Sequence, residues 1–141
     1  KKPIPYPSGG LFSTADDMAT FYQAILNGGE IDGVRILSPD SVKQMTAMIT
    51  PKSIEAGFTP GCSWGLGWGV VREPQGVTAM LSPGTFGHGG AYGTQSWGDP
   101  VREIVYILMV QRRSFGNGDA SIIRGDFQQL ASDAVEHIPR P

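Results

Sequence analysis

The sequence predicts an α+β fold, in which two helices come first, an antiparallel sheet follows, and a C-terminal helix packs on that sheet. Three observations predict it. Patterns of helical period occupy the first third of the chain, short strand-like runs divided by turn residues occupy the middle, and one long amphipathic pattern closes it. Twenty glycines and eleven prolines lie at the joints between these runs, which indicates tight turns within one folded unit of residues 1–141.

Residues 14–26 are predicted to form the first helix. Ser13 followed by Asp16 resembles a capping box, in which side chains satisfy free backbone groups at a helix start. Asn27-Gly28-Gly29 ends the pattern, because glycine accommodates the left-handed conformation that follows many helices. The apolar residues at helical spacing are Met18, Phe21, Tyr22, Ile25 and Leu26.

A short hairpin and a second helix are predicted next. Asp32-Gly33 is the two-residue signal of a type I′ turn, so we expect a hairpin over residues 30–36. Ser38 can cap the second helix, and Pro39 suits its first position. We expect this helix to continue until Pro51, which cannot extend it.

The middle of the chain is predicted to contain three or four mostly antiparallel strands. After an irregular loop over residues 51–63, residues 66–70 alternate apolar side chains with glycines, as a half-buried strand does. Residues 77–81 form a weaker candidate, and residues 86–97 are glycine-rich at first and strand-like later. Residues 103–111 form the clearest strand. They are apolar on both faces, which is typical of the centre of a covered sheet.

A long helix is predicted to close the chain and to cover one face of the sheet, with Pro139 as its stop. Its apolar stripe consists of Ile123, Phe127, Leu130, Ala134 and Ile138. The polar side chains opposite that stripe are Gln128, Gln129, Asp133 and Glu136.

Composition and charge exclude several classes of protein. The formal net charge is -2 and no cluster of lysine and arginine interleaves with aromatic residues, so nucleic acid is not an expected partner. The longest apolar run, residues 104–110, is too short to cross a bilayer, so we expect a soluble chain. Cys62, His88 and His137 are the only thiol and imidazole groups, which excludes an intrachain disulfide and the usual four-ligand zinc sites. No metal or cofactor is predicted, and the compartment stays open.

The segment around His88 is the most informative for chemistry. Glycine weakens a strand unless another backbone or a ligand must approach closely, so we expect something to dock against residues 86–90. On a strand, His88 and Gly90 project to the same side, and nearby N–H groups could polarise a carbonyl oxygen as half of an oxyanion hole. The alternative is that the glycines make a bulge and His88 is a hydrogen-bonded surface residue.

Four separated segments of the sequence match short motifs that occur together, and in the same order, in one family of proteins. They are Ser8-Gly9-Gly10-Leu11-Phe12-Ser13-Thr14-Ala15-Asp16-Asp17-Met18, Leu26-Asn27-Gly28-Gly29, Gly65-Leu66-Gly67-Trp68 and Gly87-His88-Gly89-Gly90. In this order they resemble the serine β-lactamase-like hydrolases, which include class C β-lactamases, penicillin-binding DD-peptidases, D-aminopeptidases and esterases. The resemblance implies a β-lactamase/transpeptidase-like fold, with residues 1–62 belonging to its helical lobe and residues 63–141 to its sheet and closing helix.

The resemblance also implies roles for single residues. The family's third catalytic motif is Lys-Thr-Gly, and some branches carry His-x-Gly instead, which His88-Gly89-Gly90 resembles. His88 would then take the cationic or hydrogen-bonding position, and the backbone N–H of Ala91 would supply one oxyanion donor. Gly89 and Gly90 would let the substrate approach, and Tyr92 would contact it. Histidine, unlike lysine in water, changes protonation near neutral pH.

Two motifs of that family are absent from the sequence. No lysine has a serine three places before it, and no tyrosine is followed two places later by asparagine, so Ser-x-x-Lys and Tyr-x-Asn are both missing. In the family both motifs precede the matched segments. We therefore expect the C-terminal portion of a larger serine hydrolase, inactive alone, whose complete form acts on a β-lactam, D-amino-acid peptide or small ester through a serine ester. Such a parent protein would be periplasmic or secreted.

The competing class is a non-catalytic binding or oligomerisation module derived from the same fold. A sheet that lacks its N-terminal strands has an unpaired edge, and unpaired edges recruit other strands. This predicts a homo-oligomer, or pairing with the missing N-terminal part.

A second pattern, Gly61-Cys62-Ser63-Trp64-Gly65, matches the Gly-x-Ser-x-Gly elbow of α/β-hydrolases. A triad in that fold would need Ser63, then an acid, then His137. The candidate acids are Asp99, Asp119, Asp126 and Asp133. The flanking sequence does not fit the required strand–turn–helix frame. We expect the three tryptophans, Trp64, Trp68 and Trp97, to serve mainly in the core, and Cys62 to have no chemical role.

Overall fold

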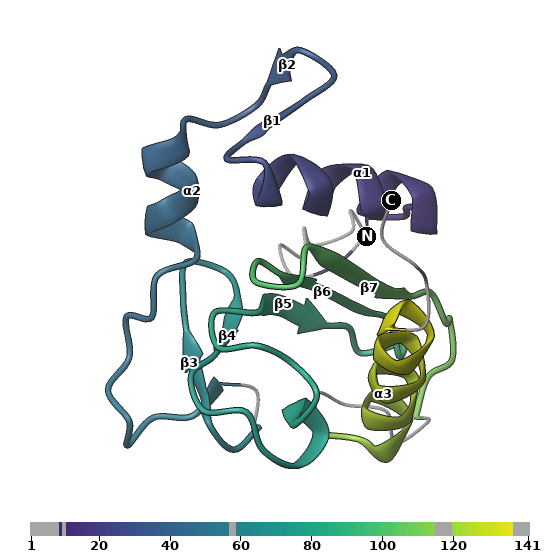
Figure 1. Cartoon of the computed structure of the whole chain (residues 1–141). Coiled ribbons are helices and arrows are strands. Elements are labelled where there is room, and N and C mark those ends of the chain that lie inside the picture. Colours follow the sequence, from purple (N-terminus) through teal and green to yellow (C-terminus); the bar gives the residue numbers. More distant parts are fainter. Residues whose placement is uncertain (1–8, 10, 57–58, 115–119, 137–141) are drawn as a thin grey trace, which may run out of the picture.

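The computed structural model describes residues 9, 11–56, 59–114 and 120–136 (Figure 1). The elements in chain order are α1 (Ala15–Leu26), β1 (Glu30–Ile31), β2 (Val34–Arg35), α2 (Pro39–Met45), β3 (Cys62–Trp64), β4 (Gly69–Val71), the 3₁₀ helix η2 (Gly76–Thr78), β5 (Phe86–Gly89), β6 (Gln95–Asp99), β7 (Ile104–Leu108) and α3 (Ile122–Glu136).

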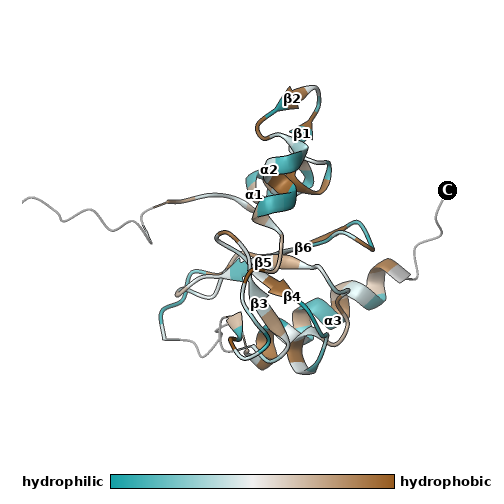
Figure 2. Cartoon of the chain, turned by 90° about the vertical axis from the view of Figure 1, so that its left-hand side faces the viewer, coloured by the Kyte–Doolittle hydropathy of each residue, from teal (hydrophilic) through white to brown (hydrophobic). Residues whose placement is uncertain are grey.

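Five of the strands form one antiparallel sheet in the order β3-β4-β5-β6-β7, so each strand pairs with its neighbours in sequence. Helix α1 packs against β6 and β7 on one side, and α3 packs against β7 and η2 on the other. Figure 2 shows these layers edge-on, with α1, α2 and the small β1–β2 sheet on one side and α3 on the opposite side. The predicted α+β fold, with a C-terminal helix on an antiparallel sheet, is confirmed.

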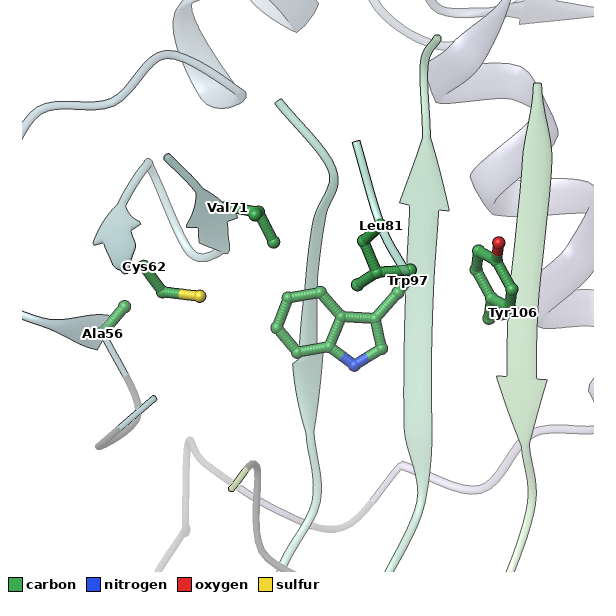
Figure 3. Close-up of a cluster of buried hydrophobic side chains, with 6 residues drawn as sticks. All are labelled: Ala56, Cys62, Val71, Leu81, Trp97 and Tyr106. Carbon is green, nitrogen blue, oxygen red and sulfur yellow. The ribbon is translucent and has the colours of Figure 1, made fainter. Parts of the chain in front are cut away.

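Each face of the sheet carries its own buried apolar cluster. On the α1 face, Tyr22 and Ile25 of the helix pack with Trp68, Val70 and Phe86. On the α3 face the buried residues are Ala56, Cys62, Val71, Leu81, Trp97 and Tyr106 (Figure 3). In Figure 3 the indole of Trp97 reaches from β6 toward the strands that precede it. Aromatic side chains of this size account for much of the energy of burial, so Trp97 is the main anchor of this face.

The first helix forms almost as predicted, but its cap differs. Helix α1 begins at Ala15, and Thr14, not Ser13, is the capping residue. The Thr14 hydroxyl accepts the backbone N–H of Asp17 at 3.1 Å. Asp16 and Asp17 lie in the first turn, where negative charge opposes the positive end of the helix dipole.

The predicted hairpin is confirmed in its turn chemistry. Asp32 and Gly33 both have positive φ, 51° and 77°, as a type I′ turn requires. Glu30 pairs with Arg35 in the register of β1 and β2, and their side chains form an ion pair.

The second helix is capped by Ser38 as predicted, but it ends at Met45 and does not continue to Pro51. The reason is a tertiary contact. The Met45 carbonyl accepts the backbone N–H of Leu66 at 2.9 Å, and it lies so close to Gly65 that a Cβ there would be 2.5 Å away. The chain returning from β3 therefore covers the end of α2.

Two strand predictions are wrong. Residues 66–70 were expected to form one strand, but β3 and β4 form a hairpin around a turn in which Gly65 N–H donates to Trp68 O at 2.8 Å. Leu66 lies in that turn and is exposed. Residues 77–81 overlap η2, not a strand, because the Thr78 hydroxyl donates to Gln75 O and the Gln75 N–H donates back to that hydroxyl. Local side-chain hydrogen bonds compete with sheet pairing in this way.

Strand β7 covers the middle of residues 103–111, but it does not lie at the centre of the described part of the sheet. Among the described residues β7 ends the sheet order and pairs only with β6. Its apolar side chains are covered by α1 on one face and α3 on the other. Two covered faces give the same apolar pattern as a central position, so the sequence could not separate the two.

The closing helix covers the sheet as predicted, but with a different face. Leu130 and Ala134 of the expected stripe are exposed, and Ile138 lies outside the described residues. The fully buried side chains of α3 are polar: Arg124, Gln128 and Ser132. Each has a matching partner. The Arg124 guanidinium lies 3.7 Å from the centre of a Trp97 ring and its Nε donates to Gln128 Oε1, while Ser132 Oγ and Tyr106 Oη are 2.8 Å apart.

Candidate active site

His88 lies near the end of β5. It pairs with Ser96 of β6. His88 is exposed. The indole of Trp64 stacks on the imidazole with ring centres 5.5 Å apart and planes inclined by 25°. One face of the imidazole is thus covered by an aromatic ring.

The imidazole is also held by a hydrogen bond to its own strand. His88 Nδ1 lies 2.5 Å from the carbonyl oxygen of Gly89. A carbonyl oxygen only accepts, so Nδ1 carries the proton. In the neutral ring Nε2 then has a free lone pair and can accept a proton, and in the charged ring it can donate one.

The tip of the β5–β6 hairpin is a tight turn over residues 90–93. Gly90 N–H donates to Thr94 O at 2.8 Å, and Gly93 N–H donates to Gly90 O at 2.9 Å. Ala91 and Tyr92 occupy the two central positions and are both exposed. Within the described residues no backbone carbonyl accepts the Ala91 N–H. That N–H can therefore hydrogen-bond to another molecule.

The glycines beside His88 are required by this chain's own packing. A Cβ on Gly87 would lie 2.2 Å from Ser96 O and 2.7 Å from the Trp97 ring. A Cβ on Gly90 would lie 2.2 Å from Thr94 Oγ1. Another group therefore approaches both glycines closely, as predicted. At Gly87 that group belongs to β6, and at Gly90 it belongs to the hairpin turn.

Tyr22, which was predicted only as part of an apolar stripe, contacts the same strand pair. Its hydroxyl donates to Ser96 O at 2.7 Å. Burial raises the pKa of the Tyr22 phenol well above its ordinary value, and the His88 backbone contact opposes this in part. The phenol therefore keeps its proton, and the bond to Ser96, throughout the neutral range. A sequence signal did exist, because a buried tyrosine hydroxyl usually needs a partner.

Buried residues of β6 also stabilise the β5–β6 hairpin. Trp97, which pairs with Gly87, donates its Nε1–H to Gln95 Oε1 at 2.8 Å. Gln95 pairs with Gly89 and is fully buried. The residues opposite both glycines that flank His88 are therefore fixed by packing and hydrogen bonding.

The elbow interpretation of Gly61-Cys62-Ser63-Trp64-Gly65 is wrong. Ser63 lies within β3, is fully buried, and its hydroxyl is 2.9 Å from Thr50 Oγ1. A turn and β4 follow it, not a helix. The Asp99 carboxylate accepts the backbone N–H groups of Ser82, Val101 and Arg102, which occupies it in a turn. Asp119 and His137 lie outside the described residues.

Other chemistries find little support in the described part of the chain. No group of three His, Cys, Asp or Glu side chains gathers there as a metal site. Cys62 is buried in the core. A shallow hollow is lined by Asp40, Lys43, Gln44 and Ala47, at α2 and just beyond, and includes no residue of the hairpin. Among the described helices none is long and apolar enough to cross a membrane.

Comparison with known families decides the classification of this chain. The Beta-lactamase family model matches residues 1–131. The chain belongs to the beta-lactamase family. The residues that match the family model include the β5–β6 hairpin, which carries His88, Ala91 and Tyr92.

Curated relatives of this beta-lactamase-family chain cover similar stretches. Protein Rv1367c of Mycobacterium tuberculosis (strain ATCC 25618 / H37Rv) is 38% identical over 112 residues, which is 73% of this chain and 28% of the relative. A protein of Escherichia coli O157:H7 named "Putative D-alanyl-D-alanine carboxypeptidase" is 34% identical over 100 residues, 71% of this chain and 22% of the relative. The chain thus spans about a quarter of the length of these relatives.

Solved structures show the same beta-lactamase-like fold. EstCE1, a hydrolase with promiscuous acyltransferase activity, matches with a TM-score of 0.63 at 24% identity, over 86% of this chain and 29% of its own. A penicillin-binding protein homologue from Caulobacter crescentus matches with a TM-score of 0.60 at 22% identity, over 85% of this chain and 32% of its own. The beta-lactamase-like fold of the chain is therefore established, together with the family.

Proposed function

We propose that this chain forms one wall of the active site of a serine hydrolase that transfers acyl groups. The observation that carries the proposal is the β5–β6 hairpin, where an exposed imidazole and an exposed backbone N–H lie within four residues of each other in a beta-lactamase-family chain. The relatives named as a carboxypeptidase and as an acyltransferring hydrolase support this class of reaction.

The proposed chemistry assigns a role to each group. A serine hydroxyl attacks the substrate carbonyl, its oxygen bonds to the carbonyl carbon, and the carbonyl oxygen becomes negative. The Ala91 N–H stabilises that oxygen, and His88 binds or polarises the substrate through Nε2. The bond to the leaving group then breaks, the leaving group receives a proton, and water hydrolyses the acyl-serine. Gly89, Gly90 and Tyr92 border the substrate, which is a β-lactam, a D-amino-acid peptide or a small ester.

The nucleophile is proposed to come from polypeptide outside these 141 residues, because the sequence contains no Ser-x-x-Lys. We expect the purified 141-residue chain to hydrolyse neither nitrocefin nor p-nitrophenyl acetate above the uncatalysed rate, measured by absorbance. Hydrolysis that the chain catalyses and that His88→Ala abolishes would contradict the external nucleophile. A Ser-x-x-Lys followed by a Tyr-x-Asn-like motif in the reading frame upstream of Lys1 would support it directly.

A second candidate, a binding or oligomerisation module, is favoured by one observation. Within the described residues β7 has no strand on its outer side. Two large apolar residues are also exposed, Val101 shortly before β7 and Ile122 at the start of α3. We propose that another strand, from a second copy or from further polypeptide of the same protein, pairs with this edge.

The isolated chain is therefore expected to self-associate. Sedimentation velocity over a hundredfold range of concentration should show the weight-average sedimentation coefficient rising with concentration, because strand pairing between copies obeys mass action. A single monomeric species throughout that range would contradict pairing at β7.

A further inference from the structure

We propose that Tyr22 is a positioning residue for His88: its buried hydroxyl joins helix α1 to the His88–Ser96 pair and fixes where the imidazole stands. The catalytic consequence rests on the proposed function. The structural part rests only on contacts within the chain.

Packing fixes the orientation of the Tyr22 ring and therefore the direction in which its hydroxyl points. The side chain is 2% exposed. Its ring is nearly parallel to that of Phe86, with centres 5.9 Å apart, and meets Trp68 edge-on at 5.3 Å. The hydroxyl at the end of this ring donates to Ser96 O at 2.7 Å. A phenol enclosed by aromatic rings cannot turn to another acceptor without opening the cluster.

The strand pair that receives this hydroxyl contains His88 itself. Ser96 and His88 are opposite each other in the β5–β6 register, and Ser96 O accepts the Tyr22 hydroxyl. The hydroxyl therefore binds directly to the residue that pairs with His88. It reaches Ser96 from α1, the helix that carries Tyr22.

A restraint is needed at this point because the backbone around His88 is glycine-rich. Gly87 precedes it, and Gly89 and Gly90 follow it. Glycine has more conformational freedom than any other residue, so this strand end gains little rigidity from its own side chains. The imidazole further depends on the local backbone, because its Nδ1 donates to Gly89 O. A shift of the strand would move the ring and its hydrogen bond together.

Packing alone does not explain the hydroxyl. Phenylalanine would fill the same space between Phe86 and Trp68, and burying a hydroxyl without a partner is unfavourable. What the oxygen adds is a directional bond to one point of the sheet. That point is the register position of His88.

The test compares two tyrosines that are buried alike. Tyr106 is 1% exposed, and its hydroxyl lies 2.8 Å from Ser132 Oγ on the α3 face. Tyr22→Phe and Tyr106→Phe each remove one buried hydrogen bond, but only the first touches the His88–Ser96 pair. In the 141-residue chain, we expect Tyr22→Phe to speed amide exchange of His88 and Gly89 about tenfold, as loss of one hydrogen bond allows. The ¹⁵N signals of the His88 ring should also shift toward a mixture of tautomers.

Tyr106→Phe should leave the His88 ring signals unchanged and its amide exchange within about twofold. Ile25→Val, a variant in the Tyr22 cluster that lowers stability without removing a polar contact, should do the same. Equal changes at His88 in all three variants would overturn the proposal, because general loosening would then suffice. In the wild-type chain, the Tyr22 hydroxyl proton should show a cross-peak to the His88 amide, and its absence would also overturn the proposal without any variant.

Activity gives a separate outcome. In an active protein that contains this chain, Tyr22→Phe should lower kcat about fivefold and change KM less than twofold. If His88→Ala proves to have no effect on activity, the proposed function fails, yet the magnetic resonance result still decides the positioning of the ring. If the ring signals are unmoved while His88→Ala abolishes activity, only the positioning role of Tyr22 fails.

Discussion

Gly87→Ala is expected to lower the free energy of unfolding by at least about 3 kcal/mol, at the upper end of what overpacking costs. The added Cβ would lie 2.2 Å from the backbone oxygen of Ser96 and 2.7 Å from the Trp97 ring. Neither can move away easily, because the first belongs to the β5–β6 ladder and the second is 2% exposed in the core. Thermal unfolding followed by circular dichroism should show Tm falling by roughly 10 °C.

Gly125→Ala provides a matched control, because the same substitution there is not expected to lower the free energy of unfolding. Gly125 lies in α3, and a Cβ there would meet Val77 at 3.4 Å, an ordinary contact. Alanine favours helix over glycine by about 1 kcal/mol, so this variant should be as stable as the wild type or more stable. A Gly87→Ala chain that unfolds at the wild-type temperature would show that β5 and β6 are not spaced as described.

If the proposed function holds, His88→Ala is expected to lower kcat of an active protein that contains this chain about 10²–10³-fold, the range found when one prearranged polar group is removed. The exposed imidazole presents Nε2 outward, since Nδ1 is bound to Gly89 O. Steady-state hydrolysis of p-nitrophenyl esters would measure the loss. His88→Gln, which keeps a polar side chain, should retain part of the activity.

His137→Ala is the matched control for that measurement, because His137 is the chain's other histidine. It should leave kcat within about twofold of the wild type, because the proposed chemistry assigns no role to His137. Loss of activity in His137→Ala with none in His88→Ala would reverse the assignment of the two histidines.

The sequence predicted those elements that depend on local chemistry. The type I′ turn at Asp32-Gly33, the Ser38 cap and the first helix needed only nearby residues, and all are present. The errors arose where distant residues decide. Leu66 N–H closes the end of α2, and Arg124 and Gln128 replace Leu130 and Ala134 on the buried face of α3. A pattern of apolar residues cannot reveal a polar side chain that has found its partner across the sheet.

The candidate site was predicted in part for the same reason. His88 stood out because glycines surround it and because the segment resembles a family motif. Its neighbours in space did not. Trp64 lies 24 positions earlier and Tyr22 lies 66 positions earlier, and each seemed to be a core residue. Strand pairing brings Trp64 to the hairpin, and the packing of α1 on the sheet brings Tyr22 there.

The polar buried face of α3 has a consequence for how this helix docks. A helix with an apolar face can shift by one turn along a sheet and replace each apolar contact with another. Arg124 on the Trp97 ring and Ser132 beside Tyr106 are two turns apart and each fits one place. A shift by one turn would break both contacts at once. We therefore expect α3 either to dock in one position or to detach from the sheet.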